Sequence, residues 1–274
     1  MDGQITAIYS LCDDVLKTLH HAEDPQCRMS DAEVMTTAIV AALYFGGKLE
    51  RARGLLAQPT YIPRMLSKSR FNRRLHALEG LLIYLFQVLG EVFKQLNASS
   101  VYLIDSFPIP ACDNIRIPRS KRYRKECYRG YTASKRRYFY GVKLYLVVTA
   151  QGEPVEMVLA PGSTADVSAL PAFNFDLPHG STLYSDSAFT LYYLEDVMRE
   201  AAGINFSPMR KKNSTRPVPA YIAYLQARGR KMVESAGSLV ARLLPKSIHA
   251  VTSRGFELKI MLFVLAYAIS GLAV

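Results

Sequence analysis

The sequence has few cysteines, and none of them stands in a pattern that would indicate a zinc site. Cysteine occurs at four of 274 positions, Cys12, Cys27, Cys112 and Cys127, and no two form a Cys-x-x-Cys pair. No histidines stand at zinc-finger spacing from them. We therefore expect reduced thiols with mostly structural roles.

Long apolar runs are also missing, as are internal repeats and low-complexity tracts. The apolar run from Ile260 to Val274 has about fifteen residues, fewer than the roughly eighteen that a membrane span needs. The first residues, Met1 to Gln4, lack the basic n-region of a signal peptide. These features predict a buried C-terminal helix, no membrane partner, and a cytoplasmic protein.

Acidic residues are scarce relative to basic ones. The chain has 23 Asp and Glu against 34 Lys and Arg, which gives a net charge of +11 and a pI near 9.5. Such a balance favours a polyanionic partner, either nucleic acid or an acidic membrane surface. Half of the residues are hydrophobic, so the chain can bury a sizeable core.

Residues 1–97 have a helical pattern throughout and predict an all-helical N-terminal domain. Ser30 to Glu33 form a capping box before an apolar helix that ends near Gly46. A short basic helix follows, with Arg70, Arg73 and Arg74 as candidate DNA contacts of a helix-turn-helix module. A solvated basic face on a packing helix, or a dimerisation surface, explains the same pattern.

Residues 98–274 predict an α/β domain in which strands come first and strands alternate with helices later. Apolar, β-branched runs occur at Val101–Ile104, Tyr138–Thr149, Pro154–Leu159, Ser181–Tyr184 and Ile204–Phe206. This order is compatible with a mixed five-stranded sheet flanked by helices. The helix expected from about 220 to 244 carries Glu234.

Three acids stand where they could form one site. Asp105 and Asp186 each end an apolar strand run, and Glu234 lies on the late helix. If the first and fourth strands are neighbours, both aspartates meet at one edge of the sheet and the helix can supply the third carboxylate. Hard oxygen ligands suit Mg²⁺, with Mn²⁺ as a substitute, and two such ions activate a water or a 3′-hydroxyl for in-line attack on a phosphodiester.

Each of these acids also has a structural explanation. Asp105 could cap a turn after its strand, Asp186 could cap the helix near Leu191, and Glu234 could pair with an arginine of its own helix. Other acids have contexts that indicate purely structural roles. These are Asp113 in a loop, Asp166 at a helix start, and Glu195 and Asp196 on an expected surface helix.

A basic segment with interleaved tyrosines, residues 116–137, separates the first acid's strand from the next strand. Cations so placed would follow a phosphate backbone, and Tyr123, Tyr128 and Tyr131 offer rings on which unpaired bases can stack. The candidate DNA contacts here are Arg116, Arg119, Lys121, Arg122, Arg124, Lys125, Arg129, Lys135, Arg136 and Arg137. Arg210, Lys211 and Lys212 could add a second phosphate contact or form a solubilising loop.

The motifs around these acids resemble the DDE transposases of bacterial insertion sequences, and most closely the insertion-sequence 982 family. The resemblance covers nearly the whole chain. Its blocks include Ile104-Asp105-Ser106-Phe107-Pro108, Arg129-Gly130-Tyr131, Tyr184-Ser185-Asp186-Ser187-Ala188-Phe189, Arg230-Lys231-Met232-Val233-Glu234 and Gly255-Phe256-Glu257-Leu258-Lys259. The chain departs from the family at Ser185 and Ser187, where Gly and Lys usually flank the second acid, and after Glu234, where a phenylalanine is missing.

The resemblance implies a ribonuclease-H-like core with Asp105, Asp186 and Glu234 as the ligands of two Mg²⁺ ions. It implies cleavage at inverted repeats of double-stranded DNA, transfer of the 3′-hydroxyl strand to target DNA, a dimer or higher oligomer in the DNA complex, and association with the nucleoid. Arg230, within the third-acid block, is a further candidate DNA contact. A structure-specific nuclease on the same core, or an inactive DNA-binding descendant of a transposase, remains an alternative.

Overall fold

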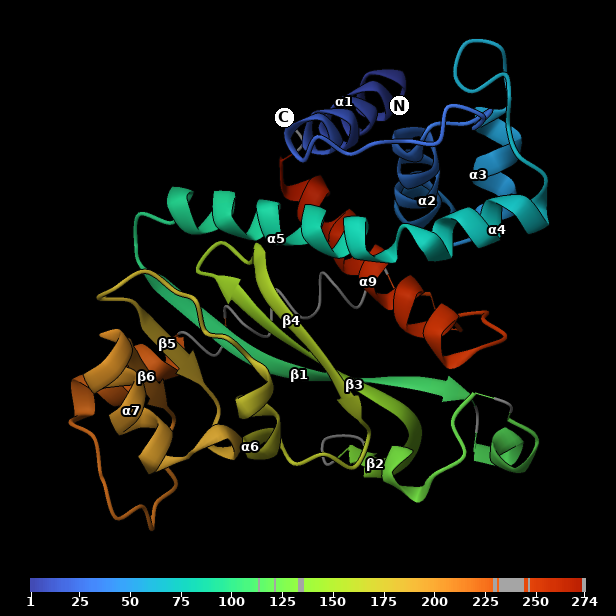
Figure 1. Cartoon of the computed structure of the whole chain (residues 1–274). Coiled ribbons are helices and arrows are strands. Elements are labelled where there is room, and N and C mark those ends of the chain that lie inside the picture. The colour runs from blue at the N-terminus through green and yellow to red at the C-terminus, as the bar shows by residue number, and fades with distance from the viewer. Residues whose placement is uncertain are drawn as a thin grey trace. The chain divides into compact units, whose positions relative to one another are not determined.

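The computed structural model describes residues 1–112, 114–120, 122–132, 136–228, 231, 244–245 and 247–272 (Figure 1). The chain divides into two compact units. The first contains Met1–Leu89 and Val240–Val274, and the second contains Gly90–Leu239. The terminal helix therefore groups with the N-terminal helices, whereas the sequence placed it with residues 98–274. How function divides between residues 1–97 and 98–274 stays a prediction.

The described part of the first unit is helical, as predicted. Ser30 Oγ accepts a hydrogen bond from the Glu33 N–H at 3.1 Å, and a Glu33 carboxylate oxygen accepts one from the Ser30 N–H at 2.7 Å, which confirms the capping box. The helices are α1 (Asp2–Thr18), α2 (Asp31–Phe45), α3 (Leu49–Leu56), α4 (Lys68–Ala77), the first part of α5 (Glu79–Leu96), and α9 (Ser253–Leu272).

Helix α9 confirms the prediction of a buried C-terminal helix. It packs against α2, and most residues between Leu258 and Ile269 are buried. Gly47 has a positive φ, and a Cβ there would lie 2.8 Å from the Phe263 ring, so the end of α2 approaches α9 too closely for a side chain. By length and composition α9 could cross a membrane, but 61% of its most apolar window is buried inside the protein, as in the core helix of a globular protein.

Burial of Cys12 on α1 leads to a testable difference in thiol reactivity. Desolvation raises the pKa of the Cys12 thiol to about 12. At pH 8 the raised pKa should leave roughly a thousandfold less thiolate at Cys12 than at an ordinary cysteine. Cys12 should therefore react more slowly, because only the thiolate is nucleophilic. Brief iodoacetamide treatment followed by mass spectrometry should label the partly exposed Cys27, Cys112 and Cys127 before Cys12. Labelling of Cys12 at the same rate as the others would contradict its burial.

The second unit is built on a mixed sheet. Its described strands are β1 (Val101–Cys112), β2 (Arg129–Thr132), β3 (Arg137–Thr149), β4 (Pro154–Pro161), β5 (Thr182–Ser185) and β6 (Asn205–Pro208). β3 pairs antiparallel with β1 on one side and with β4 on the other. β5 adds parallel to β1, and β6 adds parallel to β5 (Figure 1). The order β4-β3-β1-β5-β6 makes the predicted first and fourth strands neighbours.

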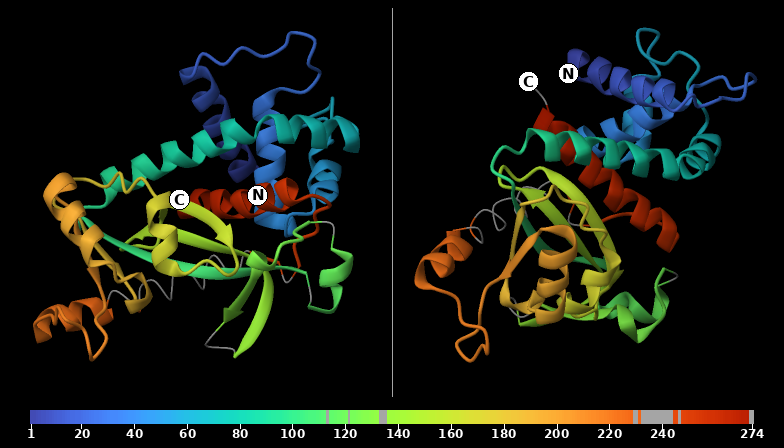
Figure 2. Two further views of the ribbon diagram at one scale, coloured as in Figure 1. Left: turned by 60° about the horizontal axis from the view of Figure 1, so that its bottom comes forward. Right: turned by 60° about the vertical axis from the view of Figure 1, so that its left-hand side comes forward.

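The described residues form one strand more than the five predicted, because β2 pairs with the first residues of β3. β2 and β4 lie on the same side of β3. β2 pairs with Arg137 to Tyr140, and β4 pairs with the residues from Val142 onward. A Cβ on Gly130 would lie 2.2 Å from the Gly162 carbonyl oxygen, so only glycine fits where β2 meets the end of β4. The β2–β3 hairpin extends from the sheet as an arm (Figure 2, left).

Strand β1 is longer than the sequence indicated. Pro108 and Pro110 pair with Lys143 and Gly141 of β3, so the strand continues seven residues beyond Asp105 to Cys112. The parallel pairing with β5, by contrast, ends at Leu103. Beyond Leu103, the edge of β1 on the β5 side has no ladder partner among the described residues. Prolines are tolerated at such an edge, because no N–H donor is needed there.

Short helical elements connect the later strands. α6 (Asp166–Ala169) and the 3₁₀ turn Leu170–Ala172 lie between β4 and β5. The 3₁₀ turn Ser187–Phe189 and α7 (Tyr192–Ala202) lie between β5 and β6, and α7 packs against β6. Residues 220–228 are helical, as expected, and the rest of the predicted late helix lies outside the described residues except Lys231, which is helical, and Leu244, which is not.

Candidate active site

The structure brings Asp105 and Asp186 to the same level of two neighbouring strands. In the parallel pair, Leu103 of β1 faces Tyr184 of β5. Each aspartate stands two residues beyond its member of that pair. Neighbouring strands lie about 4.8 Å apart, and residues two apart project to the same face. The register therefore places Asp105 and Asp186 at the same level of two neighbouring strands, and a shared site of the two carboxylates stays a prediction.

A backbone N–H group close in the chain binds one oxygen of each aspartate. Asp105 Oδ1 accepts from the Ser106 N–H at 2.7 Å, and Asp186 Oδ1 accepts from the Ala188 N–H at 2.8 Å. Asp186 thereby caps the 3₁₀ turn Ser187–Phe189 and not the helix at Leu191 that the structural alternative invoked. Both side chains are half-buried, so each carboxylate is oriented by the protein and still reaches solvent.

Glu234, the third predicted acid, lies outside the described residues, as do Lys121, Lys135 and Arg230. Among the residues that the structure describes, no group of three His, Cys, Asp or Glu side chains gathers as a metal site. The two aspartates offer hard carboxylate oxygens without a cysteine or histidine nearby in the sequence motif, and this donor chemistry fits Mg²⁺ or Mn²⁺.

A polar cluster lies beside Asp105 and was not expected from the sequence. Asp166 Oδ1 accepts hydrogen bonds from Ser106 Oγ and Lys143 Nζ, both at 3.1 Å. Lys143 Nζ also donates to the Thr164 carbonyl oxygen at 2.8 Å. The sequence predicts a structural role for Asp166 at a helix start, and the structure adds a partly buried ion pair with Lys143.

Comparison with known protein families decides the identity of this arrangement. Residues 95–244, more than half of the chain, match the family described as "Transposase DDE domain". The chain belongs to this family of DDE transposases. Searches of curated proteins and of solved structures found no match. The mixed sheet with flanking helices agrees with the ribonuclease-H-like fold of the family, and DDE transposases generally use divalent metal ions.

The transposase exposes most of its predicted DNA contacts between β1 and β3. Arg116, Arg119, Arg124, Lys125, Arg129, Arg136 and Arg137 are exposed, and Arg122 is half-buried. Arg129 also pairs with Glu126 at 2.5 Å. Tyr131 and Tyr138 face each other across the β2–β3 arm with ring centroids 5.0 Å apart, and both are exposed. Tyr123 is buried, so it is not available for stacking with a base.

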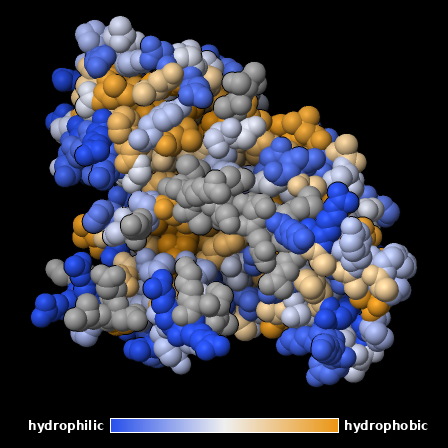
Figure 3. Space-filling view, turned by 180° about the vertical axis from the view of Figure 1, so that it is seen from behind, coloured by the Kyte–Doolittle hydropathy of each residue, from blue (hydrophilic) through white to orange (hydrophobic). Residues whose placement is uncertain are grey.

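Hydrophilic side chains, blue in Figure 3, gather in several separate groups on the face shown there.

On α4, Arg70 and Arg73 are exposed. Arg74 instead makes an ion pair with Asp31 and donates a hydrogen bond to Cys27 Sγ at 2.8 Å. Asp31 also makes a hydrogen bond with His21 at 2.8 Å. Within the first unit, Arg70 and Arg73 are thus accessible and a DNA contact by them stays a prediction, whereas Arg74 joins α4 to the start of α2.

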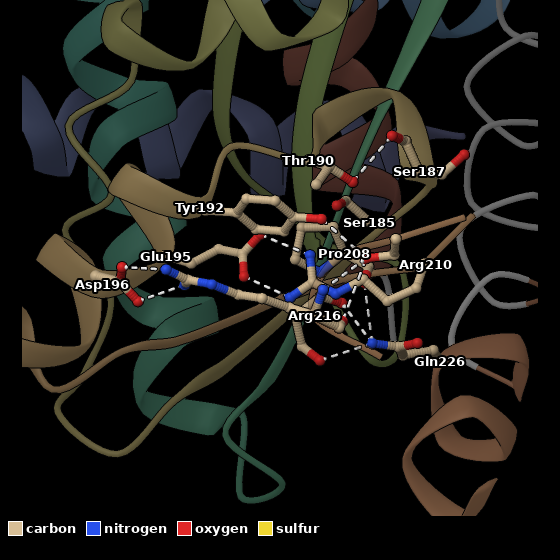
Figure 4. A network of polar contacts seen from close by, with 12 residues as sticks. Ser185, Ser187, Thr190, Tyr192, Glu195, Asp196, Pro208, Arg210, Arg216 and Gln226 are labelled. Carbon is tan, nitrogen blue, oxygen red and sulfur yellow. Dashed lines mark hydrogen bonds and ion pairs between the residues drawn. The ribbon is translucent and has the colours of Figure 1, made fainter. Parts of the chain in front are cut away.

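Arg210 has a partner that the sequence did not reveal. Its guanidinium makes two hydrogen bonds, at 2.8 and 2.5 Å, to the carboxylate of Glu195 on α7 (Figure 4). Glu195 is 1% exposed, so it lies on the buried side of the helix that the sequence predicted to be at the surface. The proximity of the Glu195 carboxylate raises the pKa of Arg210. Lys211 and Lys212 are exposed, and a DNA contact by this basic segment stays a prediction.

The same network includes a second arginine and a tyrosine ring. Arg216 makes a bidentate pair with Asp196 at 2.8 and 2.9 Å, and its guanidinium lies 4.8 Å from the centroid of Tyr192. The guanidinium of Arg210 lies 5.2 Å from the same centroid (Figure 4). The two arginines therefore tie the loop after β6 to α7.

Gln226 is a positioning residue that sequence reasoning missed. It is buried on the helical segment 220–228, and its side-chain amide donates to Ser207 Oγ at 2.9 Å and to the Pro208 carbonyl oxygen at 3.0 Å (Figure 4). These bonds fix the helical segment that precedes Glu234 to the end of β6. A glutamine among exposed tyrosines gives no sequence pattern from which this contact could be predicted.

Proposed function

We propose that this protein is an active DNA transposase of the insertion-sequence 982 type. It binds the ends of its element, cleaves phosphodiester bonds there, and transfers the freed 3′-hydroxyl strand to target DNA. The observation that carries the proposal is the matching position of Asp105 and Asp186 beyond the β1–β5 pair. Glu234, in the motif of the third acid, completes the catalytic set in this proposal.

In the proposed mechanism, Asp105, Asp186 and Glu234 would hold two Mg²⁺ ions by their carboxylate oxygens. When bound, such ions supply Lewis-acid activation of the attacking oxygen and neutralise the charge that develops on the leaving oxygen. The Ser106 and Ala188 N–H groups hold the aspartates in one orientation before DNA arrives. No covalent protein intermediate is needed, because water attacks first and the 3′-hydroxyl attacks second.

The β2–β3 arm and the preceding loop form the proposed DNA surface of the catalytic unit. Exposed cations of this segment neutralise phosphates, and Tyr131 and Tyr138 present ring faces beside Arg136 and Arg137. Arg70 and Arg73 on α4 are the proposed contacts of a DNA-binding N-terminal module. We further propose a dimer or higher oligomer on DNA and a cytoplasmic, nucleoid-associated protein.

Replacing Arg136 and Arg137 together by glutamine should reduce the salt dependence of DNA binding. Each lost phosphate contact lowers the slope of log affinity against log salt by about 1, so the double variant should lose about 2. Fluorescence anisotropy with a labelled duplex at several salt concentrations measures the slope. Lys17→Gln removes an exposed lysine of α1 that pairs with Asp13 and should leave the slope unchanged. Equal slopes for the wild type and the arm variant would contradict the proposed surface.

Two other functions predict different products from the same DNA. A structure-specific nuclease on this core would hydrolyse the element ends and release nicked DNA without joining it to a target. An inactive DNA-binding descendant would bind the ends and cut nothing. Incubation of the protein with labelled end DNA, target plasmid and Mg²⁺ distinguishes the three, because only the transposase yields end DNA covalently joined to the plasmid.

A further inference from the structure

The cluster around Asp166 is tied to the strand that carries Asp105 by several bonds in series. Lys143 of β3 binds Asp166, Asp166 binds the Ser106 hydroxyl, and the Ser106 N–H binds the Asp105 carboxylate. Asp105 and Ser106 are consecutive in a strand, so their side chains project to opposite faces of the sheet. The ion pair therefore holds Ser106 from the face opposite the catalytic carboxylate.

The ion pair is itself held firmly. The side chains of Lys143 and Asp166 are 17% and 18% exposed, and Lys143 Nζ has the Thr164 carbonyl oxygen as a second acceptor at 2.8 Å. The fully buried Tyr145, next but one to Lys143 on β3, donates to that carbonyl oxygen at 3.2 Å. Ser106 faces Tyr145 directly in the β1–β3 register. A side chain at Ser106 is thus surrounded by partners that fix its position.

The cluster also reaches the second acid. The ring of Tyr145 makes an edge contact with Phe189, with centroids 6.2 Å apart and planes at 88°. Phe189 is fully buried and ends the 3₁₀ turn that Asp186 caps. Residues around Thr164 to Asp166 consequently contact β1 next to Asp105 through Ser106 and, through Tyr145 and Phe189, the turn that Asp186 caps.

We propose that Asp166 and Lys143 are positioning residues that orient the Asp105 carboxylate for metal binding through Ser106. This inference rests on the proposed function, in which Asp105 is a metal ligand. Partners behind a metal ligand typically contribute about 10–100-fold to metal affinity, because they restrict the ligand to its bound orientation. Here the restriction passes through the backbone of Ser106, because its hydroxyl donates to Asp166 and its N–H donates to Asp105.

Mn²⁺ binding to the full-length protein tests the inference without requiring the DNA substrate. Free Mn²⁺ is measured by electron paramagnetic resonance during titration, and thermal unfolding is measured on the same samples. We expect Ser106→Ala, which removes the hydroxyl, and Asp166→Ala, which removes its acceptor, to weaken Mn²⁺ binding about 10–100-fold. Ser106→Thr keeps the hydroxyl and should bind as the wild type does. Ser270→Ala removes an exposed hydroxyl of α9 and serves as the matched control.

A double variant separates positioning from stability. Lys143→Met with Asp166→Leu replaces the ion pair by apolar side chains, and such replacements often preserve stability. If the pair positions Asp105, the double variant unfolds near the wild-type temperature but keeps the Mn²⁺ defect, because Ser106 has lost its acceptor. If Mn²⁺ affinity follows the unfolding temperature in every variant and recovers in the double variant, the positioning role is overturned.

Asp105→Asn separates failure of this inference from failure of the proposed function. If Asp105→Asn weakens Mn²⁺ binding while Ser106→Ala and Asp166→Ala do not, only the positioning role is rejected. If Asp105→Asn binds Mn²⁺ as the wild type does, including no binding by either protein, the metal site at Asp105 is rejected and the positioning role falls with it.

Discussion

The Asp105→Asn variant is expected to bind DNA normally and to lose DNA cleavage by roughly a hundred- to ten-thousand-fold, since a metal ligand supports several kcal/mol of transition-state stabilisation. Asparagine keeps the oxygen that accepts the Ser106 N–H, so the strand retains its local hydrogen bond. It removes the negative charge that a divalent ion needs. Single-turnover cleavage of labelled end DNA measures the rate, and anisotropy measures binding.

The control for this variant is another aspartate-to-asparagine change outside the site. Asp176 is highly exposed, with 84% of its side chain accessible, and Asp176→Asn should cleave at the wild-type rate. Cleavage by Asp105→Asn within about threefold of the wild-type rate would mean that Asp105 is not a ligand of the catalytic metal. Asp105 in β1 and Asp186 after β5 would then have another role.

The Glu195→Gln variant is expected to lose about 3–5 kcal/mol of folding stability, because breaking a buried ion pair leaves an uncompensated charge. Glu195 is 1% exposed and its partner Arg210 is 12% exposed, so water cannot replace the lost carboxylate. The Nε of Arg210 is already buried without a hydrogen-bond partner in the described structure. Urea unfolding followed by circular dichroism measures the change in free energy.

The adjacent residue provides a matched control on the same helix. Asp196 pairs with Arg216 in a similar bidentate geometry, but the two side chains are 40% and 47% exposed. Exposed pairs contribute about 0–1 kcal/mol, so Asp196→Asn should change stability little. Equal losses for the two variants would show that burial does not distinguish these pairs, and the structural role assigned to Arg210 would have to be withdrawn.

The local elements of this fold could be predicted from the sequence because their causes are local. The capping box at Ser30 starts α2, and the apolar run of Tyr138 to Thr149 forms β3. Strand β2 was not among the five predicted strands, because its four residues lie within a run of cations and tyrosines. Their strand hydrogen bonds come only from pairing with β3. The length of β1 also depends on pairing, since Pro108 reads as a stop until its partner Lys143 is known.

The sequence predicts the three acids of the candidate site, of which the structure describes Asp105 and Asp186, but it does not predict the residues that surround these two. Asp105 and Asp186 each follow an apolar run, a pattern visible in one sequence, although their register depends on strands about eighty residues apart. The bonds from Lys143 to Asp166 and from Arg210 to Glu195 join segments far apart in the chain. From the sequence, Glu195 on an amphipathic helix is expected at the surface. Its burial can be explained only once the position of its partner Arg210 is known.

A strand-transfer assay tests the central claim most directly. Purified protein is incubated with labelled DNA that carries the inverted repeats flanking its gene, target plasmid, and Mg²⁺ or Mn²⁺. Glu234→Gln is the paired control, since glutamine keeps the shape of the side chain and removes its charge. We predict joined products with the wild type and none with Glu234→Gln. Binding of the end DNA by the wild type without cleavage or joining under either metal would contradict the account of this protein as an active transposase.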